Sequence, residues 1–239
     1  MRVTNYLLGY KNLKIVQDTD MFNFSLDSVL LPNFVTLNKN ISNILDIGCG
    51  NAPIPLILST KSTAKITGVE LQKESYEMAK ESVSINNLNK QIEIINSDIN
   101  DYYKTLETDI FDVITCNPPF FKYIESSNIN KNDEKTFARH EIKLNLSQIF
   151  TISKKLLKNN GVVAIVHRPE RLIEIIEEMK KNNIEPKKMQ LVYPKKNMNA
   201  NILLIEGKKN GKPGLKILPP IYTHEFDGSY TDDVKKYFE

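Results

Sequence analysis

Short apolar runs alternate with longer helical patterns along most of the chain, beginning near residue 41. Apolar runs bounded by polar or turn-forming residues are typical of buried strands. They predict strands at Asn43–Ile47, Lys65–Glu70, Gln91–Asn96, Phe111–Cys116, Gly161–Val166, Lys187–Tyr193 and Ala200–Glu206. Apolar positions with helical spacing predict helices at Pro53–Thr60, Gln72–Asn86, Phe137–Leu157 and Pro169–Lys181. We expect the third helix to end in the C-cap sequence Asn159-Asn160-Gly161.

Strands that alternate with helices indicate an α/β fold with a mostly parallel sheet, because each parallel strand needs a helical crossover. Only a short linker separates the last two strands, so we expect them to form an antiparallel hairpin at one edge of a seven-stranded sheet. This predicts one domain over residues 41–207. Residues 1–40 are expected to be an N-terminal extension with a hairpin around Gly9–Asn12, and residues 208–239 a tail packed on or near the core.

Composition fits a soluble globular protein. Among the 239 residues, 41% are hydrophobic and 26% are charged, and no apolar run approaches the length of a membrane span. The N-terminus lacks the features of a signal peptide. The chain has three histidines and two cysteines, Cys49 and Cys116, without a CxxC pair. We expect a reduced, cytoplasmic protein without a structural metal.

Charge is unevenly distributed near the C-terminus. Eight lysines lie between Lys187 and Lys216 against one acid, Glu206, and five acids then follow among residues 217–239. One interpretation is that the basic segment faces a polyanion such as RNA. The other is that the lysines merely cover solvated faces, and the sequence favours neither.

The first predicted strand leads into a glycine-containing turn, Asp46-Ile47-Gly48-Cys49-Gly50-Asn51-Ala52-Pro53. Glycines let the backbone turn tightly and approach a ligand at a helix N-terminus. A dinucleotide fingerprint would need glycine at position 53, where the chain has Pro53. The turn also lacks the lysine of a phosphate-binding P-loop, so this motif indicates a different ligand.

Acidic residues follow the next two predicted strands. Glu70 ends the second strand and Asp98 follows the third. The carboxyl ends of parallel strands converge, so we expect Asp46, Glu70 and Asp98 to share one site. Such a site suits a nucleoside that carries positive charge better than a phosphate. Each acid also has a structural alternative: Asp46 capping the turn, Glu70 beginning the next helix, and Asp98 N-capping a short helix.

This arrangement resembles the S-adenosylmethionine-dependent methyltransferases with a Rossmann-like, seven-stranded fold and helices on both faces. The resemblance covers about Ile41 to Gly207, with Ala52 in place of the third glycine of the family's first motif. It implies a set of cofactor-binding residues. Gly48 and Gly50 would line the methionine end with Asp46; Glu70 and Leu71 would lie at the ribose, Asp98 and Ile99 at the adenine, and Asn117 and Asp27 beside them.

The fourth predicted strand ends in Asn117-Pro118-Pro119-Phe120. An amide or exocyclic nitrogen is a poor nucleophile because its lone pair is delocalised. Two acceptors, the Asn117 side-chain oxygen and the Pro118 carbonyl, would hold its two N–H groups and favour the developing positive charge. Pro119 stiffens the segment, and Phe120 offers a stacking face. The alternative is a rigid turn; Phe121 lines the same pocket or packs beneath the loop.

Asn-Pro-Pro-aromatic enzymes methylate adenine N6, cytosine N4, guanine N2 or a protein glutamine. Several segments resemble the tRNA1(Val) adenosine N6-methyltransferases, in their low-GC Gram-positive and mollicute branch. The segments are Phe24–Leu31, Thr115–Phe120, Ala138–Glu141, His167–Leu172, Glu206–Pro213 and Leu218–Pro220. The resemblance implies tRNA as the partner, with adenosine 37 in the anticodon loop as the target. Another RNA or DNA base, a protein glutamine, or non-catalytic RNA binding are the alternatives.

Other residues near the predicted site keep two interpretations each. Asp27 either flanks the cofactor or N-caps a helix over Ser28–Leu31. Arg139 and His140 follow a long polar loop, Lys122–Thr136, and Arg139 either meets a phosphate or is solvated. His167 and Arg168 either contact RNA or have a structural role. We expect a monomer.

Overall fold

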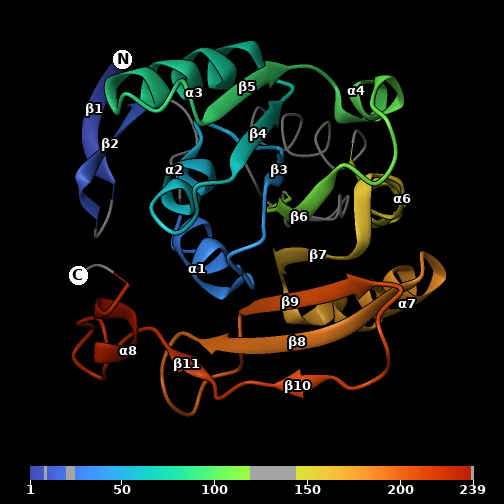
Figure 1. Cartoon of the computed structure of the whole chain (residues 1–239). Helices are drawn as coiled ribbons and strands as arrows, with labels where there is room; N and C mark the ends of the chain where they lie inside the picture. Colours follow the sequence, from blue (N-terminus) through green and yellow to red (C-terminus); the bar gives the residue numbers. More distant parts are fainter. Residues whose placement is uncertain (8–9, 20–24, 119–143, 238–239) are drawn as a thin grey trace, which may run out of the picture.

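The central sheet has the strand order β10-β8-β9-β7-β6-β3-β4-β5, with β11 also paired to β8. The computed structural model describes residues 1–7, 10–19, 25–118 and 144–237 (Figure 1). The strand bounds are β3 (Asn43–Ile47), β4 (Lys65–Glu70), β5 (Ile92–Asn96), β6 (Phe111–Cys116), β7 (Leu157–His167), β8 (Ile184–Tyr193), β9 (Ile202–Lys209), β10 (Lys216–Ile217) and β11 (Ile221–Tyr222). Strands β3 to β7 pair in parallel, and β9 is antiparallel to both its neighbours. The predicted α/β fold with a mostly parallel sheet is confirmed.

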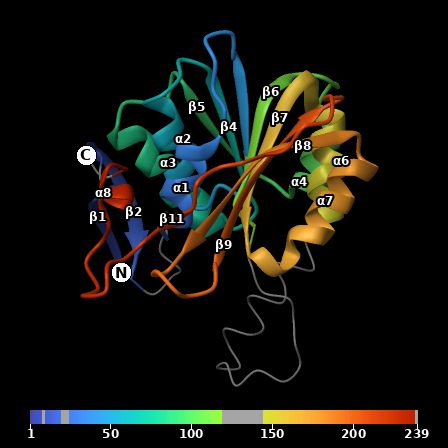
Figure 2. The ribbon, with the colours of Figure 1, turned by 90° about the horizontal axis from the view of Figure 1, so that it is seen from below.

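Helices cover both faces of this sheet (Figure 2). One face carries α1 (Asp27–Phe34), α2 (Pro53–Ser59), α3 (Lys73–Ile85) and α8 (Asp232–Lys235). The other carries α4 (Ile99–Thr105), α6 (Leu146–Leu156) and α7 (Leu172–Lys181), the last entered through a 3-10 turn at Pro169–Arg171. Successive strand residues belong to different cores: Val113 packs in the first and Ile114 in the second. Burial on both faces explains why these strands are almost continuously apolar.

The third predicted helix is shorter than its apolar pattern indicates. Helix α6 begins at Leu146, after a capping box between Asn145 and Gln148. The chain at residues 144 and 145 is not helical, and residues 137–143 lie outside the described residues. The predicted C-cap is also wrong, because α6 ends at Leu156 and residues 157–167 form β7. An asparagine cap at position 145 satisfies the first backbone N–H groups and so fixes where the helix starts.

The sheet also has more strands than predicted, because the C-terminal segment adds two short ones. Strand β9 lies between β7 and β8, so the β8–β9 hairpin has only one free side. On that side β10 and β11 pair in parallel with β8, at Lys216↔Lys188 and Ile221↔Val192. Covering an edge strand removes a row of unpaired backbone groups that would otherwise invite association.

The N-terminal residues form the expected antiparallel hairpin, made of β1 (Arg2–Leu7) and β2 (Tyr10–Asp18). The turn at residues 8–9 lies outside the described residues. The hairpin contacts α3, where the Val16 N–H donates to the buried Ser82 hydroxyl at 2.9 Å. The division of the chain at residues 40 and 207 stays a prediction.

A buried carboxylate, that of Glu206, fixes the chain at the end of α1 to the sheet. Its contacts with Thr36 and Lys188 are here called the Glu206 clamp. Glu206 of β9 accepts hydrogen bonds from the backbone N–H and the hydroxyl of Thr36, at 2.6 and 2.8 Å. The Lys188 ammonium lies 3.4 Å from the same carboxylate and donates to the Phe34 carbonyl at 2.6 Å. Charge and hydrogen bonds are thus satisfied together, which is the condition for burying an ion pair. Lys188 and Glu206, one lysine and the one acid of the predicted basic segment, therefore have a structural role.

We predict that Glu206→Gln lowers the free energy of unfolding by about 2–4 kcal/mol, because the amide turns a donor toward Thr36 or Lys188 and leaves the ammonium uncompensated. Urea unfolding measures the change. Glu107 is exposed, so Glu107→Gln is the matched control and should stay within about 0.5 kcal/mol of wild type. Equal stability of the two variants would contradict a stabilising role of the Glu206 clamp.

Candidate active site

The polar residues at the carboxyl ends of the parallel strands lie along one edge of the sheet, here called the carboxyl edge. β3 is the central strand of this edge, and its Ile47 is paired with Val69 of β4 on one side and Cys116 of β6 on the other. Asp46 lies in β3, Glu70 ends β4, and Asn117 follows β6 directly. The sheet register therefore brings together three residues that are far apart in the sequence.

The turn after β3 presents its backbone to open space. Gly48 and Gly50 have φ values of +69° and +57°, and a Cβ atom built on either would meet no atom of the described residues within 4 Å. The N–H groups of Gly48 and Cys49 donate to the Val69 carbonyl at 2.9 and 3.1 Å, which anchors the turn to β4. Ala52, in place of the usual glycine, also has a positive φ of 72°. The turn keeps the conformation of a glycine loop at some cost in strain.

Asp46 is fully buried, and only one of its carboxylate oxygens is satisfied. Oδ1 accepts a hydrogen bond from the Thr115 hydroxyl of β6 at 2.6 Å. Oδ2 is buried and has no hydrogen-bond partner within the described part of the chain. Burial raises the pKa of Asp46 to about 7; the Thr115 hydrogen bond opposes this rise and the Glu70 charge adds to it. The sequence allowed a capping role for Asp46, but a capping role does not explain why Oδ2 is buried without a hydrogen-bond partner among the described residues.

Glu70 ties the turn to the start of α3. Its carboxylate accepts from the Gly50 N–H at 2.8 Å and from the Gln72 N–H at 2.7 Å. Helix α3 begins at Lys73, so Glu70 lies before it and is not its first residue. The backbone around Glu70 and the half-buried Leu71 is held by the Asn96 side chain, which donates to both carbonyls at 2.9 and 3.2 Å.

Asp98 adopts the structural role that the sequence left open. It is the N-cap of α4, and its Oδ1 accepts from the backbone N–H of Asn100 at 2.8 Å. Ile99, the first residue of α4, is buried. Because β5 pairs with β4, this cap lies beside Glu70 at the carboxyl edge. An N-cap and a ligand contact are compatible, because a carboxylate has several acceptor sites.

Asn117 contacts a residue that sequence reasoning did not select. Its Nδ2 lies 3.3 Å from the Ser28 hydroxyl of α1. No local pattern reveals this contact, because the two residues are 89 positions apart. Pro118 is described beside Asn117, whereas Pro119, Phe120 and Phe121 lie outside the described residues, as do Arg139, His140 and the loop before them.

Asp27 is the first residue of α1, and the N-cap is Leu26, so the N-cap interpretation of Asp27 is wrong. The Asp27 carboxylate accepts from the Ser25 hydroxyl at 2.9 Å. Burial raises the pKa of Asp27, while that hydrogen bond and the positive charge of Arg168 lower it. Asp27 therefore lies in a buried polar corner where α1 meets the end of β7.

His167 and Arg168 differ in their surroundings. His167 is buried, and its Nδ1 accepts from the Arg168 N–H at 2.8 Å. Burial, reinforced by the Arg171 charge, lowers the pKa of His167 to about 4, so the ring is neutral at pH 7. The Arg168 guanidinium donates to the Asn201 carbonyl at 2.8 Å and is half-buried. These contacts favour the structural interpretation for His167.

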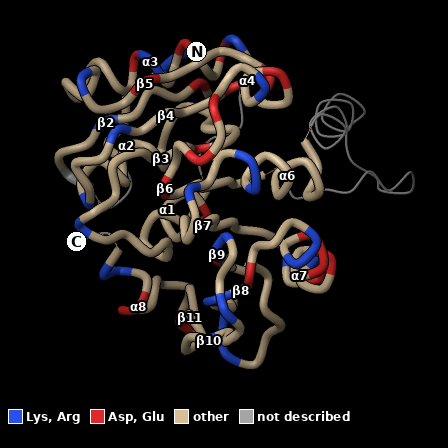
Figure 3. The backbone as a smooth tube through the Cα atoms, turned by 45° about the vertical axis from the view of Figure 1, so that its right-hand side comes forward, with Lys and Arg blue, Asp and Glu red and all other residues tan. Residues whose placement is uncertain are grey.

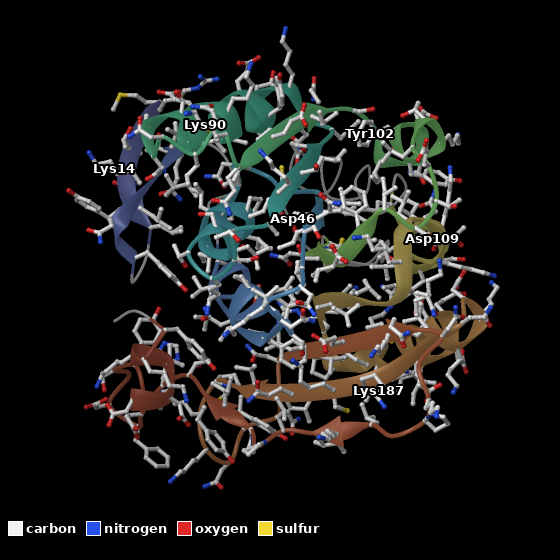
Figure 4. The ribbon with its side chains drawn as sticks, viewed as in Figure 1. Lys14, Asp46, Lys90, Tyr102, Asp109 and Lys187 are labelled. Atoms are coloured by element: carbon white, nitrogen blue, oxygen red, sulfur yellow. The ribbon has the colours of Figure 1, made fainter. Side chains whose placement is uncertain are left out.

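The cofactor implied by the sequence resemblance fits this edge. S-Adenosylmethionine carries a positively charged sulfonium and an ammonium group. Asp46, with its buried and unsatisfied Oδ2, comes just before two glycines that have open space at their Cα atoms within the described residues. Asp46 lies deep in the middle of the molecule (Figure 4). A cationic ligand group there would offset the cost of burying the carboxylate. Among the described residues, no cluster of three or more His, Cys, Asp or Glu is arranged to hold a metal ion.

We predict that Asp46→Asn stabilises the cofactor-free protein at high pH. Folded Asp46 keeps its proton up to about pH 7, while the unfolded group loses it near 3.8, so the stability from this group is lost as pH rises between these values. The variant has no such loss. Its advantage in free energy of unfolding should grow by about 3 kcal/mol from pH 5 to pH 8. Urea unfolding at both pH values measures it; a constant difference would contradict the raised pKa.

Comparison with known proteins shows which protein family the chain matches. Residues 24–185 match the methyltransferase small domain family. A tRNA1(Val) (adenine(37)-N6)-methyltransferase from Flavobacterium psychrophilum is 25% identical over 92% of this chain and 95% of its own length. One of the same name from Cytophaga hutchinsonii is 29% identical, covering 74% and 70%. Another, from Shewanella sediminis, is 24% identical, covering 88% of each. The relatives come from diverse bacteria and give no support to the low-GC Gram-positive branch.

Solved structures agree with this placement at the level of the fold. A predicted O-methyltransferase from Agrobacterium tumefaciens superposes with a TM-score of 0.68 at 18% identity, covering 89% of this chain and 96% of that one. The geranyl diphosphate C-methyltransferase of Streptomyces coelicolor A3(2), solved with S-adenosyl-L-homocysteine, gives 0.57 at 10% identity, covering 76% and 79%. The family match extends over most of the chain, and it includes the glycine turn, Glu70, Asp98 and Asn117. The chain therefore belongs to the methyltransferase small domain family.

Proposed function

We propose that this chain is an S-adenosylmethionine-dependent adenine N6-methyltransferase that acts on tRNA, with adenosine 37 of tRNA1(Val) as its target. The observation that carries the proposal is the position of Asn117 and Pro118. They follow β6 directly, next to the strand that holds Asp46 with its unsatisfied oxygen. The substrate is supported by the relatives' names, which agree across several bacteria.

The carboxyl edge divides into parts that match the parts of the cofactor. Asp46, Gly48 and Gly50 would hold the methionine end, because the unsatisfied carboxylate and the open backbone lie there. Glu70, with Leu71 beside it, would accept hydrogen bonds from the ribose hydroxyls. The N–H groups of Gly50 and Gln72 fix the orientation of the Glu70 carboxylate. The remaining proposed cofactor residues are Asp98 and Ile99 at the adenine, and Asp27 and Asn117 beside the methyl group.

The residues of this chain prepare the amine for transfer. When bound, the cofactor supplies an electrophilic methyl group. Asn117 Oδ1 and the Pro118 carbonyl would each accept one N–H of the target amine, which directs the nitrogen lone pair at the methyl carbon. The target nitrogen would take the methyl group as its bond to the cofactor sulfur breaks, and the extra proton on nitrogen would then leave to water. Pro119 and Phe120 would stiffen the segment and stack on the base, as the sequence predicts.

The lysines of the predicted basic segment do not form one surface. Strands β8 and β9 run antiparallel, so the start of β8 and the end of β9 lie together at the amino edge of the sheet, opposite the carboxyl edge. Six of the eight lysines follow this edge: Lys187, Lys188, Lys208, Lys209, Lys212 and Lys216. Only Lys195 and Lys196 belong to the turn between β8 and β9. That turn lies on the same side of the sheet as the carboxyl ends of β6 and β7 (Figure 2), whereas other basic segments lie along β8, β9 and β10 (Figure 3).

This division favours Lys195 and Lys196 over the rest of the segment as RNA contacts. Lys209 is paired with Asp109 at 2.6 Å, and Lys188 belongs to the Glu206 clamp, so neither is available to a phosphate. Lys196 is exposed, and Lys195 lies 3.4 Å from the Phe226 carbonyl. An RNA that delivers a base to Asn117 must approach the carboxyl edge, where these two lysines would meet its backbone.

We predict that Lys195→Glu/Lys196→Glu weakens tRNA binding and reduces the slope of log affinity against log salt by about one for each lysine that contacts a phosphate. The matched control is Lys212→Glu/Lys216→Glu, which reverses two exposed charges at the amino edge. Binding titrations at several salt concentrations measure both. If the control variant changes the slope as much, the RNA lies elsewhere.

We predict that Asn117→Ala lowers methyl transfer by at least about a hundredfold, because one of two preorganised acceptors is lost. Cofactor affinity should stay near that of wild type, because Asn117 is proposed to lie beside the methyl group only, while other residues hold the methionine end, the ribose and the adenine. Labelled cofactor is incubated with total tRNA, and nucleosides are identified by mass spectrometry. Asn159→Ala, at an exposed position of the amino edge, is the control.

The nucleoside products separate the alternatives. N6-Methyladenosine in tRNA1(Val) supports the proposal, whereas another methylated base in tRNA, rRNA or DNA, or a methylated glutamine, would move the target. RNA binding without any transfer would indicate a non-catalytic protein on this scaffold. The anticodon-loop contact, the monomeric state, the absence of a metal, the bacterial branch and the three-part division of the chain stay predictions. Within the described ranges, no helix is both long and apolar enough to cross a membrane.

A further inference from the structure

We propose that Ser28 is a positioning residue, which holds the side-chain amide of Asn117 in the orientation that transfer requires. This inference rests on the proposed function, because it assigns Ser28 a task only if Asn117 accepts from the target amine. Ser28 lies in the first turn of α1, its hydroxyl is 3.3 Å from Asn117 Nδ2, and 5% of the residue is exposed.

The direction of the contact is what matters chemically. A carboxamide is planar, so a contact that fixes Nδ2 also fixes the direction of Oδ1. The nitrogen can only donate, whereas the target amine needs an acceptor. With Nδ2 held on Ser28, the amide presents its oxygen to the substrate side. Without that contact, the terminal torsion of asparagine is broad and admits the opposite orientation.

Helix α1 is anchored firmly enough to act as a reference. Every residue of α1 except Asn33 is buried, and Asn33 donates to the Val29 carbonyl at 2.7 Å. Just beyond its C-terminal end, the clamp between Thr36 and Glu206 fixes the chain to β9. A contact group on a rigid, packed helix holds its partner more closely than a group on a loop does.

The first turn of α1 has buried polar side chains at positions where an apolar residue would have a lower free-energy cost of burial. Asp27 and Ser28 are both buried at this turn, and burying a hydroxyl is unfavourable unless it is hydrogen-bonded. The Asp27 carboxylate is satisfied locally by Ser25. The Ser28 hydroxyl differs, because its contact is with Asn117, directly after the end of β6. The polar residue at position 28 is therefore explained by its contact with Asn117.

The test compares Ser28→Ala with Ser28→Thr and Ser28→Cys. We expect Ser28→Ala to lower kcat about tenfold to hundredfold, because a small misplacement of a reacting group is costly. The KM for tRNA and the cofactor Kd should stay within about twofold, since the amide contact affects only the geometry of transfer. Ser28→Thr restores the hydroxyl and should recover most of kcat; Ser28→Cys keeps the volume with a weaker contact and should fall between.

A matched control measures the effect on kcat of deleting a buried hydroxyl away from the site. Ser153 of α6 is fully buried, and its hydroxyl has no hydrogen-bond partner in the part of the chain that the structure describes. Ser153→Ala deletes the same atom far from the carboxyl edge, so kcat should equal that of wild type. Urea unfolding of each variant shows whether a loss of kcat follows a loss of folded protein.

The outcomes separate this inference from the proposed function. If Asn117→Ala is inactive and Ser28→Ala keeps the wild-type kcat, the positioning role is wrong and the proposed function stands. If Asn117→Ala is fully active, the proposed mechanism fails. A parallel loss of cofactor affinity and kcat in Ser28→Ala would show that Ser28 acts on the cofactor site, and would overturn the inference. Support requires a fall in kcat alone, rescued by Ser28→Thr.

Discussion

The pairing of β3 with β4 on one side and β6 on the other is the constraint on which the site depends. Both ladders are parallel and in register, so the three strands end at the same edge. The Thr115 hydroxyl reinforces one ladder by donating to Asp46 at 2.6 Å. A shift of one residue in either ladder would turn Asp46 or Thr115 to the opposite face of the sheet. Such a shift would also exchange the side chains that pack in the two cores, such as Val113 and Ile114, and a close-packed core does not tolerate that exchange.

Several features of the carboxyl edge are unfavourable for folding and favourable for binding. Asp46 is buried with one oxygen unsatisfied, and Ala52 is held at a positive φ. In the described part of the chain, open space adjoins Gly48 and Gly50. Strain and unsatisfied groups persist only where the surrounding structure fixes them, and they concentrate at functional sites. The continuous apolar packing on both faces of the sheet provides that fixed surrounding here.

The N-terminal residues belong to the site as much as the central domain does. Helix α1 packs against β7 and β9, and it contacts Asn117, just after β6, through Ser28. Its C-terminal end is fixed by Glu206 and Lys188, which come from two strands late in the sequence. The position of Asn117 is thus determined by residues from the beginning, middle and end of the chain.

The sequence by itself determined the alternation of strands and helices, because apolar spacing and turn residues act locally. The bounds of β3, β4 and β6 agree with prediction, as does the placement of Asp46, Glu70 and Asn117 at one edge. The start of α6 is also local, because Asn145 and Gln148 form a capping box three residues apart, but the apolar pattern alone extends beyond it. Only the tertiary structure decided the addition of β10 and β11 to β8, the division of the lysines between two edges, and the contact of Ser28 with Asn117. Each of these depends on partners distant in sequence, and periodicity carries no information about which surfaces meet.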